Sequence, residues 1–237
     1  MERGEYERLA AVEDRMWWTR ALRRNLRTAA APFAGMPDGR LLDAGCGTGG
    51  FLAALAHRAS FGLDRDGFAC RLAYTKTQRP VTQGSVDDLP FDDAAFDIIV
   101  SADVLCHRGV GIERALGEMR RCLKPGGALV VNLPAYPWLY SAHDRAVDNV
   151  RRFYRREVIE QLAAAGFGHI RAIYWNTLLF PLMVARRLLP GGSSEVGLLP
   201  APLEWLFDAT AAFESALLSS GLRLPFGGSI LAVGTRR

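Results

Sequence analysis

The chain has 237 residues but only four cysteines, and no two of them stand in the C-x-x-C spacing. Cys46, Cys70, Cys106 and Cys122 are too far apart to indicate a zinc site or a disulfide framework. We therefore expect free thiols in a reducing cytoplasm and no resident metal. The N-terminus, Met1–Glu5, is charged and has no apolar core, which predicts that no secretory signal is present.

Long apolar runs and strongly basic runs are missing as well. The longest apolar stretch, Ala172–Ala185, contains Asn176 and Pro181 and is shorter than the ~20 residues that a membrane span needs. The net charge is +4 and the pI about 9.1, but there is no lysine-rich run and most arginines are dispersed. We expect a soluble, cytoplasmic protein with no nucleic-acid partner.

The most informative stretch that is present is Leu41–Gly50, with the sequence LLDAGCGTGG. It predicts a buried strand that ends at an acidic residue, a glycine-rich turn, and a helix over Phe51–Arg58. Glycines let the backbone of such a turn approach a ligand closely, because no Cβ atom stands in the way. The first N–H groups of the following helix also lack intrahelical partners. The turn is therefore expected to hold a nucleotide-like cofactor.

Two classes of cofactor fit this turn. Gly45, Gly47 and Gly50 satisfy the dinucleotide fingerprint, which favours a nicotinamide-dependent oxidoreductase. Asp43 argues against it, because a carboxylate at the mouth of the turn repels a pyrophosphate. S-adenosylmethionine carries a sulfonium and an ammonium instead, so the same carboxylate attracts it. Asp64, placed where a second strand ends, is positioned to accept both ribose hydroxyls. The charge pattern favours S-adenosylmethionine, with the oxidoreductase as the alternative.

Strands and helices alternate from Arg40 onward, which predicts an α/β fold with a Rossmann-like, doubly wound seven-stranded parallel sheet. The strands that we can place are Arg40–Ala44, Ser60–Leu63, Phe96–Ser101, Ala128–Leu133, His169–Trp175 and Ser229–Thr235. Helices are expected over Phe51–Arg58, Ile112–Cys122 and Arg155–Ala165. Ligands of such sheets bind beyond the carboxyl ends of the strands.

We expect a single domain over residues 1–237. Residues 6–30 form an N-terminal helical cap, and residues 40–175 and 226–237 form the core. Residues 176–225 are apolar, rich in leucine and broken by Pro181, Pro190 and Pro200, which predicts a helical insertion before the last strand. This insertion either packs on the core without a further role or forms a lid over the substrate. Weak peripheral contact with a membrane is a third option.

Four blocks within residues 40–135 resemble the signature motifs of the class I S-adenosylmethionine-dependent methyltransferases. They read LLDAGCGTGG, GLD, GSVDDLPFDDAAFDIIVSADVLCH and LKPGGALVVNLPA. Glu13–Trp18 with the following Arg23-Arg24 resembles the E-D-R-H-W-W-F…R-R opening of a bacterial subgroup, although Met16 and Thr19 depart from it. The segments LYSAHD (139–144), RRFY (151–154) and PFGGS (225–229) resemble later motifs of that subgroup. The resemblance names the reaction better than the substrate.

The resemblance implies where the cofactor would bind. Gly45 and Gly47 would line its methionine portion. Ser85 and its neighbour would bracket the adenine, although many members of the family have Asp in place of this serine. Ser101 and Ala102 would flank the sulfonium. The full set of expected cofactor contacts is Trp17, Asp43, Gly45, Cys46, Gly47, Asp64, Arg65, Ser85, Val86, Ser101 and Ala102.

Methyl transfer is an in-line displacement with a neutral sulfide leaving, so the protein must chiefly align the reactants and exclude water. A base is needed only for an alcohol, acid or protonated-amine acceptor, and histidine suits that role near neutral pH. His143 is our candidate base, with a structural hydrogen bond as the alternative. Asp144 and Tyr154 are further catalytic candidates, and Asp144 fits a turn residue equally well.

Three more residues are candidates for binding the acceptor: Trp18, His107 and Arg152. Arg152 fits a solvated basic patch equally well, and His107 fits a structural residue better. Trp17 and Trp18 either anchor the N-terminal helix or cover the sulfonium by a cation–π contact. The expected protein is a methyltransferase, monomeric or homodimeric, that acts on an O, N or C nucleophile of a small or lipid-like molecule. A cofactor-binding protein without turnover is a further alternative.

Overall fold

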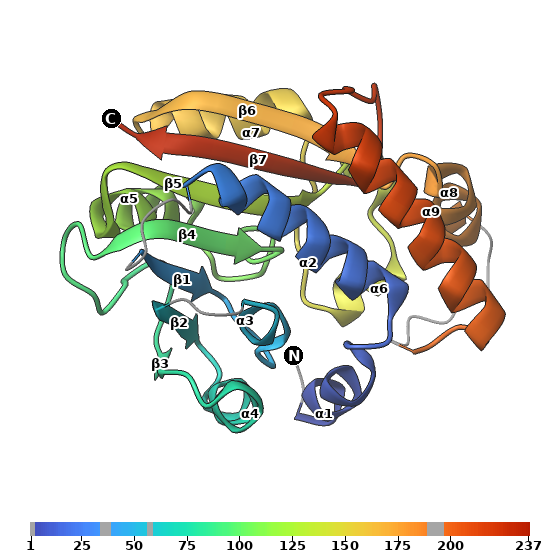
Figure 1. The fold of residues 1–237 in the computed structure, drawn as a ribbon, viewed down its shortest axis with the longest axis horizontal. Helices are drawn as coiled ribbons and strands as arrows, with labels where there is room; N and C mark the ends of the chain where they lie inside the picture. The colour runs from blue at the N-terminus through green and yellow to red at the C-terminus, as the bar shows by residue number, and fades with distance from the viewer. Residues whose placement is uncertain (1–2, 34–38, 56–58, 189–196) are drawn as a thin grey trace.

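The computed structural model describes residues 3–33, 39–55, 59–188 and 197–237 (Figure 1). The strands are β1 (Arg40–Ala44), β2 (Ala59–Asp64), β3 (Val81–Gln83), β4 (Phe96–Ala102), β5 (Leu123–Pro134), β6 (Phe167–Trp175) and β7 (Ser229–Arg236). The helices are α1 (Arg3–Val12), α2 (Trp17–Ala30), α3 (Gly50–Ala53), α4 (Gly67–Thr77), α5 (Ile112–Cys122), α6 (Ala142–Ala146), α7 (Arg155–Ala164), α8 (Phe180–Leu188) and α9 (Ala201–Ser219). Two short 3-10 helices, η1 (Ala31–Phe33) and η2 (Pro137–Leu139), complete the list.

The seven strands form one sheet in the order β3-β2-β1-β4-β5-β7-β6. This confirms the Rossmann-like, doubly wound arrangement, with the winding reversing between β1 and β4. Strand pairs from β3 to β5 are parallel, but β7 is antiparallel to both of its neighbours, so the expectation of a wholly parallel sheet is wrong for β7. The insertion explains the difference. Ser229 pairs with Trp175, so the chain re-enters the sheet at the edge where β6 left it and must run in the opposite direction.

Helices cover both faces of the sheet. Figure 1 shows α2 lying across the near face with α9 beside it, and α5 and α7 behind the sheet. Successive residues of β1 point to opposite faces, so Leu41 packs in the cluster with α2, α3 and α9, whereas Leu42 packs in the cluster with α5 and α7. Because both faces are buried, the central strands read as continuous apolar runs.

Local signals determine some elements better than others. The bounds of β1 and α5 agree with the sequence expectation. β3, with three residues, and α4, which begins after its capping residue Asp66, were not placed by the sequence pattern. The predicted helix after the glycine turn is shorter than expected: α3 ends at Ala53, and residues 56–58 of that prediction lie outside the described residues.

The expected N-terminal segment consists of two helices, α1 and α2, and the insertion contributes α8 and α9. Pro190, at which a break in the insertion was expected, lies outside the described residues. Within the described ranges, no helix has a stretch long and apolar enough to cross a bilayer.

Candidate cofactor and acceptor site

The glycine turn between β1 and α3 is held against the end of β2. The N–H groups of Gly45 and Cys46 both donate to the carbonyl oxygen of Leu63, at 2.7 and 2.9 Å. Gly45 and Gly47 both have left-handed backbone angles, with φ of +92° and +52°. A Cβ on Gly45 would lie 2.1 Å from Cγ2 of Val104, whereas a Cβ on Gly47 would meet no atom within 4 Å. No described atom therefore obstructs an approach to the backbone at Gly47.

Asp43 is a buried carboxylate with an incomplete set of partners. It is 2% exposed, and its Oδ2 atom has no hydrogen-bond partner among the described residues. Burial, together with the negative charges of Asp64 and Glu13, raises the pKa of Asp43 to about 8, and the charge of Arg23 opposes the shift. A buried carboxylate in this state is stabilised by any cation that approaches it.

Asp64 lies at the end of β2, as expected, and its two oxygens are each partly engaged. Oδ2 accepts from the N–H of Gly47 at 2.9 Å, and Oδ1 accepts from the N–H of Asp66 at 3.0 Å. Burial raises the pKa of Asp64, although these two hydrogen bonds lower it. Because a carboxylate oxygen accepts two hydrogen bonds, each oxygen keeps room for a hydroxyl group.

Ser101 is a second buried polar group without a partner. It is 1% exposed at the end of β4, and its Oγ atom has no hydrogen-bond partner among the described residues. Unsatisfied buried polar atoms are uncommon, and a ligand is one reason for them. Ser101 and Asp43 lie on neighbouring strands, because Asp43 pairs with Val100. The adjoining Ala102 closes β4 and is half-buried.

The other expected cofactor residues differ in their surroundings. Val86 is buried, but Ser85 is exposed and its Oγ accepts from the N–H of Asp87 at 3.1 Å. Cys46 is buried with its Sγ atom near the carbonyl oxygen of Gly47. Arg65 extends away from the turn and donates to the carbonyl oxygen of Arg108 at 3.2 Å.

A cluster of charges joins the N-terminal helices to the glycine turn. Glu13 is 5% exposed and accepts from Thr48 Oγ1 and Lys76 Nζ, both at 2.7 Å, and from Arg23 at 2.8 Å. A Cβ on Gly50 would collide with the side chains of both Glu13 and Arg23. Glu13 of the opening motif is therefore in direct contact with the glycine turn. Sequence reasoning quoted Glu13 and Arg23 as a motif without giving them a role.

Trp17 and Trp18 pack into an aromatic cluster at the start of α2. Trp18 stacks on Trp175 of β6, with centroids 4.6 Å apart and an angle of 11°. Trp17 meets Phe207 of α9 edge to face at 5.6 Å, and its backbone N–H donates to Glu204 at 2.7 Å. These contacts agree with the alternative that the two rings anchor the N-terminal helix.

Asp103, which sequence reasoning missed, follows β4 at the same edge. Its two carboxylate oxygens accept from Nδ2 of Asn132 at 3.0 and 3.1 Å. The other side-chain atom of Asn132, Oδ1, accepts from Nε1 of Trp175 at 2.7 Å. Burial raises the pKa of Asp103 to about 7, although the hydrogen bond from Asn132 and the charge of Arg152 oppose the shift. Its left-handed φ of +55° could not be foreseen from the sequence.

Asp144 belongs to an ion network rather than to an open site. The side chain of Asp144 is fully buried. Its Oδ1 atom accepts from Arg152 at 2.8 Å. Its Oδ2 atom accepts from Arg187 at 2.8 Å and from the N–H of Ser141 at 2.9 Å. Arg152 also donates to the carbonyl oxygen of Ala135 at 2.9 Å, and its side chain is 3% exposed. The expectation that Asp144 is catalytic and that Arg152 binds an acceptor is corrected by this geometry, because their polar atoms are committed to each other and to the chain. A solvated basic patch is equally excluded for Arg152.

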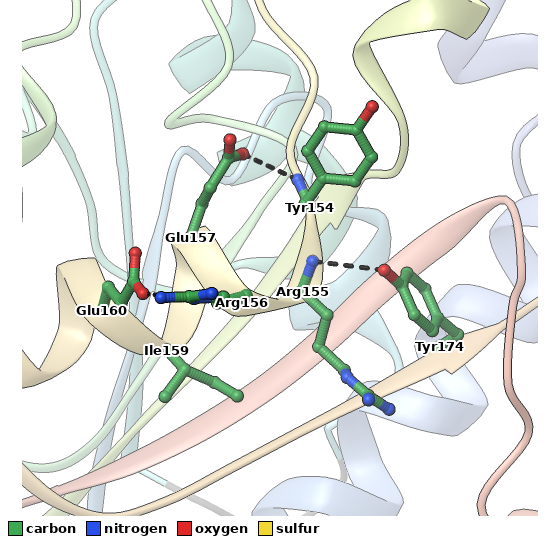
Figure 2. A pocket seen from close by; sticks show the side chains of 7 residues that line it. All are labelled: Tyr154, Arg155, Arg156, Glu157, Ile159, Glu160 and Tyr174. Atoms are coloured by element: carbon green, nitrogen blue, oxygen red, sulfur yellow. Dashed lines mark hydrogen bonds and ion pairs between the residues drawn. The ribbon is translucent and has the colours of Figure 1, made fainter.

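The remaining candidates are His143, His107 and Tyr154, which come from three different segments. His143 is half-buried in the first turn of α6, and His107 is half-buried beside Asn149, where burial lowers the pKa of His107. Tyr154 is 42% exposed at the start of α7. With Tyr174 it lines a surface depression of about 730 Å³ (Figure 2). Figure 2 shows that the backbone N–H of Tyr154 bonds to Glu157, which fixes the start of the helix.

Comparison with known proteins shows what this chain is similar to. Residues 42–131 match a family model described as a methyltransferase domain. The chain is 29% identical over 206 residues to 24-methylenesterol C-methyltransferase 2 of Oryza sativa subsp. japonica, which covers 68% of this chain and 55% of that enzyme. It is 30% identical over 135 residues to a "Probable S-adenosylmethionine-dependent methyltransferase" of Mycolicibacterium smegmatis, covering 54% of this chain and 51% of that protein. The chain thus spans about half the length of these relatives.

The fold is shared with solved structures. A SAM-dependent methyltransferase of Thermotoga maritima, described as a possible histamine N-methyltransferase, superposes with a TM-score of 0.61 at 22% identity. The superposition covers 99% of this chain and 95% of that one. Residues 42–131 therefore match a methyltransferase family model, and the whole chain shares the fold of this solved structure.

Proposed function

We propose that this chain transfers a methyl group from S-adenosylmethionine to an O, N or C nucleophile of a small or lipid-like acceptor, as the match of residues 42–131 to a methyltransferase family model suggests. The observation that carries the proposal is the pair of buried carboxylates beside the glycine turn. Asp43 has an oxygen without a partner, and Asp64 has room for two more hydrogen bonds. Both features suit a cationic ligand that carries a ribose.

The charges at the turn support this cofactor over a dinucleotide. After burial, the negative charges of Asp64 and Glu13 raise the pKa of Asp43, so negative charge is already crowded at the turn. A pyrophosphate would add two further negative charges, whereas a sulfonium and an ammonium would neutralise part of the field. The residues present therefore fit the proposed cofactor.

The proposal gives each residue a task. The cofactor, when bound, supplies a methyl group on a positively charged sulfur. Asp43 and the open backbone at Gly47 would hold its amino-acid end, and Asp64 would accept the ribose hydroxyls. Ser101 would donate its unsatisfied hydroxyl to the ligand, and Val86, buried beside the exposed Ser85, would support the adenine. The aromatic cluster at the start of α2 would exclude water on one side of the cofactor.

Two observations bear on the class of acceptor. The insertion exposes large apolar side chains on α9, with Trp205 73% exposed, and the rice relative is named for a sterol substrate. These observations favour a lipid-like acceptor for this chain. His143, half-buried on α6, stays our candidate base for an acceptor that must lose a proton, and Tyr154 stays a candidate beside it.

Isothermal titration calorimetry tests the cofactor assignment. The wild-type protein is expected to bind S-adenosylhomocysteine and not NAD⁺. Asp43→Asn should weaken binding about tenfold, the equivalent of ~1.4 kcal/mol. Asp92→Asn, an exposed change beyond the glycine turn, is the matched control and should leave binding unchanged. Tight binding of NAD⁺ without uptake of S-adenosylhomocysteine would reverse the assignment.

A separate measurement addresses turnover. Methyl transfer from radiolabelled S-adenosylmethionine, measured with series of alkyl alcohols, amines and sterols, is expected to give product. His143→Ala tests the candidate base: transfer to alcohols slowed by about 10²–10⁴-fold, with unchanged affinity for S-adenosylhomocysteine, would support that role. Unchanged rates in this variant would remove His143 from the site.

A further inference from the structure

Asp103 follows β4 at the carboxyl edge of the sheet, close to the glycine turn. Ala102, the last residue of β4, pairs with Asn132 of β5, so Asp103 leaves the sheet at its carboxyl edge. Val104, the next residue, lies against Gly45 of the cofactor turn, since a Cβ on that glycine would fall 2.1 Å from Cγ2 of Val104. Asp103 therefore sits directly beside the turn, two residues after the unsatisfied Ser101.

The carboxylate is held in place by a chain of contacts. Asn132 donates one amide group to both oxygens of Asp103, and Trp175 donates its indole N–H to the other side of Asn132. Trp175 in turn stacks on Trp18 of α2. Asn132 is fully buried, so its orientation is fixed by these partners. Asp103 itself is half-buried, and its oxygens keep unused lone pairs.

The backbone at Asp103 is left-handed, as it is at six other non-glycine residues in the described part of the chain. Its φ of +55° is uncommon for residues other than glycine, and Asp and Asn tolerate it best. Strained backbone of this kind clusters at functional sites. A residue with the sole task of turning the chain would be served equally well by glycine.

We propose that Asp103 receives the nucleophile of the acceptor, and that this acceptor is an amine or an alcohol that presents an N–H or O–H group to the carboxylate. The proposal rests on the proposed function and names the substrate class of the same site. In the transfer step, the nitrogen or oxygen forms a bond to the methyl carbon while the carbon–sulfur bond breaks. The electron pair of that bond stays on sulfur, and the proton passes to a carboxylate oxygen of Asp103.

Few charged groups face this carboxylate. Arg152 and Asp144, which are paired with each other, act on it with opposite signs. The Sγ atom of Cys106 donates to the backbone oxygen of Asp103 rather than to its carboxylate, and burial raises the pKa of that thiol. Asn132 is neutral. Burial thus dominates, and Asp103, with its pKa raised to about 7, changes its charge near neutral pH, where a general base works best.

Asp103→Asn separates an acceptor-binding role from a structural one. Asparagine keeps an oxygen that can accept from Asn132 and tolerates the left-handed backbone, so the variant should fold. We expect its melting temperature and its affinity for S-adenosylhomocysteine to equal those of the wild type. Asp92→Asn, an exposed residue before β4, is the matched control.

The probes are 1-aminoalkanes and 1-alkanols of four to twelve carbons, titrated into the complex with S-adenosylhomocysteine. The wild type should bind members of both series, and Asp103→Asn should bind them at least tenfold more weakly. The affinity of the wild type for the amines should rise about tenfold between pH 6 and pH 8, since the ionised fraction of an acid with a pKa near 7 rises from about a tenth to about nine tenths. The variant should show no such rise.

The results of these titrations test the assignment of Asp103 and the proposed function separately. Equal affinity of the two proteins for every probe, or no binding of any amine or alcohol to the wild type, overturns the assignment of Asp103. Lost stability together with lost cofactor affinity in Asp103→Asn also overturns it, in favour of a structural role. Failure of the wild type to bind S-adenosylhomocysteine would instead overturn the proposed function, so the two failures are distinguishable.

Discussion

Removing the charge of Asp144 should unfold the protein more easily rather than slow its chemistry. Asp144 is fully buried, and its two oxygens accept from Arg152 and Arg187, each at 2.8 Å. The side chain of Arg152 is 3% exposed and that of Arg187 is 16% exposed. Asp144→Asn keeps the shape and one acceptor oxygen but leaves two arginines in a poorly solvated place without their counter-ion.

The expected magnitude follows from that burial. Breaking a buried ion pair by removing one partner costs about 3–5 kcal/mol. For a chain of this size, about 1 kcal/mol shifts the melting temperature by about 2–4 °C, so Asp144→Asn should melt about 6–20 °C lower. The affinity of the folded variant for S-adenosylhomocysteine should stay near that of the wild type.

The pH dependence gives a second readout. Burial raises the pKa of Asp144, but the hydrogen bond and charge of Arg152 and the charge of Arg187 outweigh it, so the pKa lies below its ordinary value of 3.8. A carboxyl with a lowered pKa stabilises the fold above its ordinary pKa, and this contribution is lost as the pH falls below it. The difference between wild type and variant should therefore narrow below about pH 3.8.

Thermal and urea denaturation followed by circular dichroism measure both effects. Glu160→Gln is the matched control, because Glu160 pairs with Arg156 at 2.6 Å on the exposed surface of α7. The melting temperature of Glu160→Gln should equal that of the wild type. Equal melting of Asp144→Asn and wild type, combined with a loss of methyl transfer, would show that Asp144 acts in the chemistry and that the structural account is wrong.

Three further changes test the cofactor end of the site. The pKa of Asp43 is raised to about 8 in the folded chain, so between about pH 4 and pH 8 its ionisation favours the unfolded state and destabilises the ligand-free protein. The melting temperature of Asp43→Asn should therefore exceed that of the wild type by a margin that grows over this range. A constant margin would contradict the burial argument. Gly47→Ala should weaken the binding of S-adenosylhomocysteine at least tenfold. Gly126→Ala is the control, because Gly126 has the same open surroundings and a φ of +78° at the other end of the sheet, and this variant should lose stability alone. Equal affinities of the two variants by calorimetry would show that nothing binds against Gly47. Glu13→Gln should loosen the glycine turn, lowering cofactor affinity about tenfold and increasing proteolysis near the N-terminus, while the exposed Glu7→Gln should change neither.

The sequence by itself determined the strand, the glycine turn and the start of the helix that follows it, because these elements depend on local patterns. The apolar run, the acid and the glycines between Leu41 and Gly50 specify a strand, a turn and a helix start within ten residues, and Asp64 follows by strand length alone. The bounds of β1 and α5 could be read from the same kind of signal. Short elements escaped: β3 has only three residues, too few for a period to show.

Only the tertiary structure decided which polar side chains are free to act. Asp144 and Arg152 are eight positions apart and read as independent candidates, yet packing buries them as partners, together with Arg187 from α8. Sequence reasoning gave Asp103 no role, and its contact with Asn132 depends on the pairing of β4 with β5. Hydrogen bonds and ion pairs between distant segments depend on where strands and helices meet in space. A one-dimensional pattern therefore locates a binding edge, while the partners of each buried charge are settled by the fold.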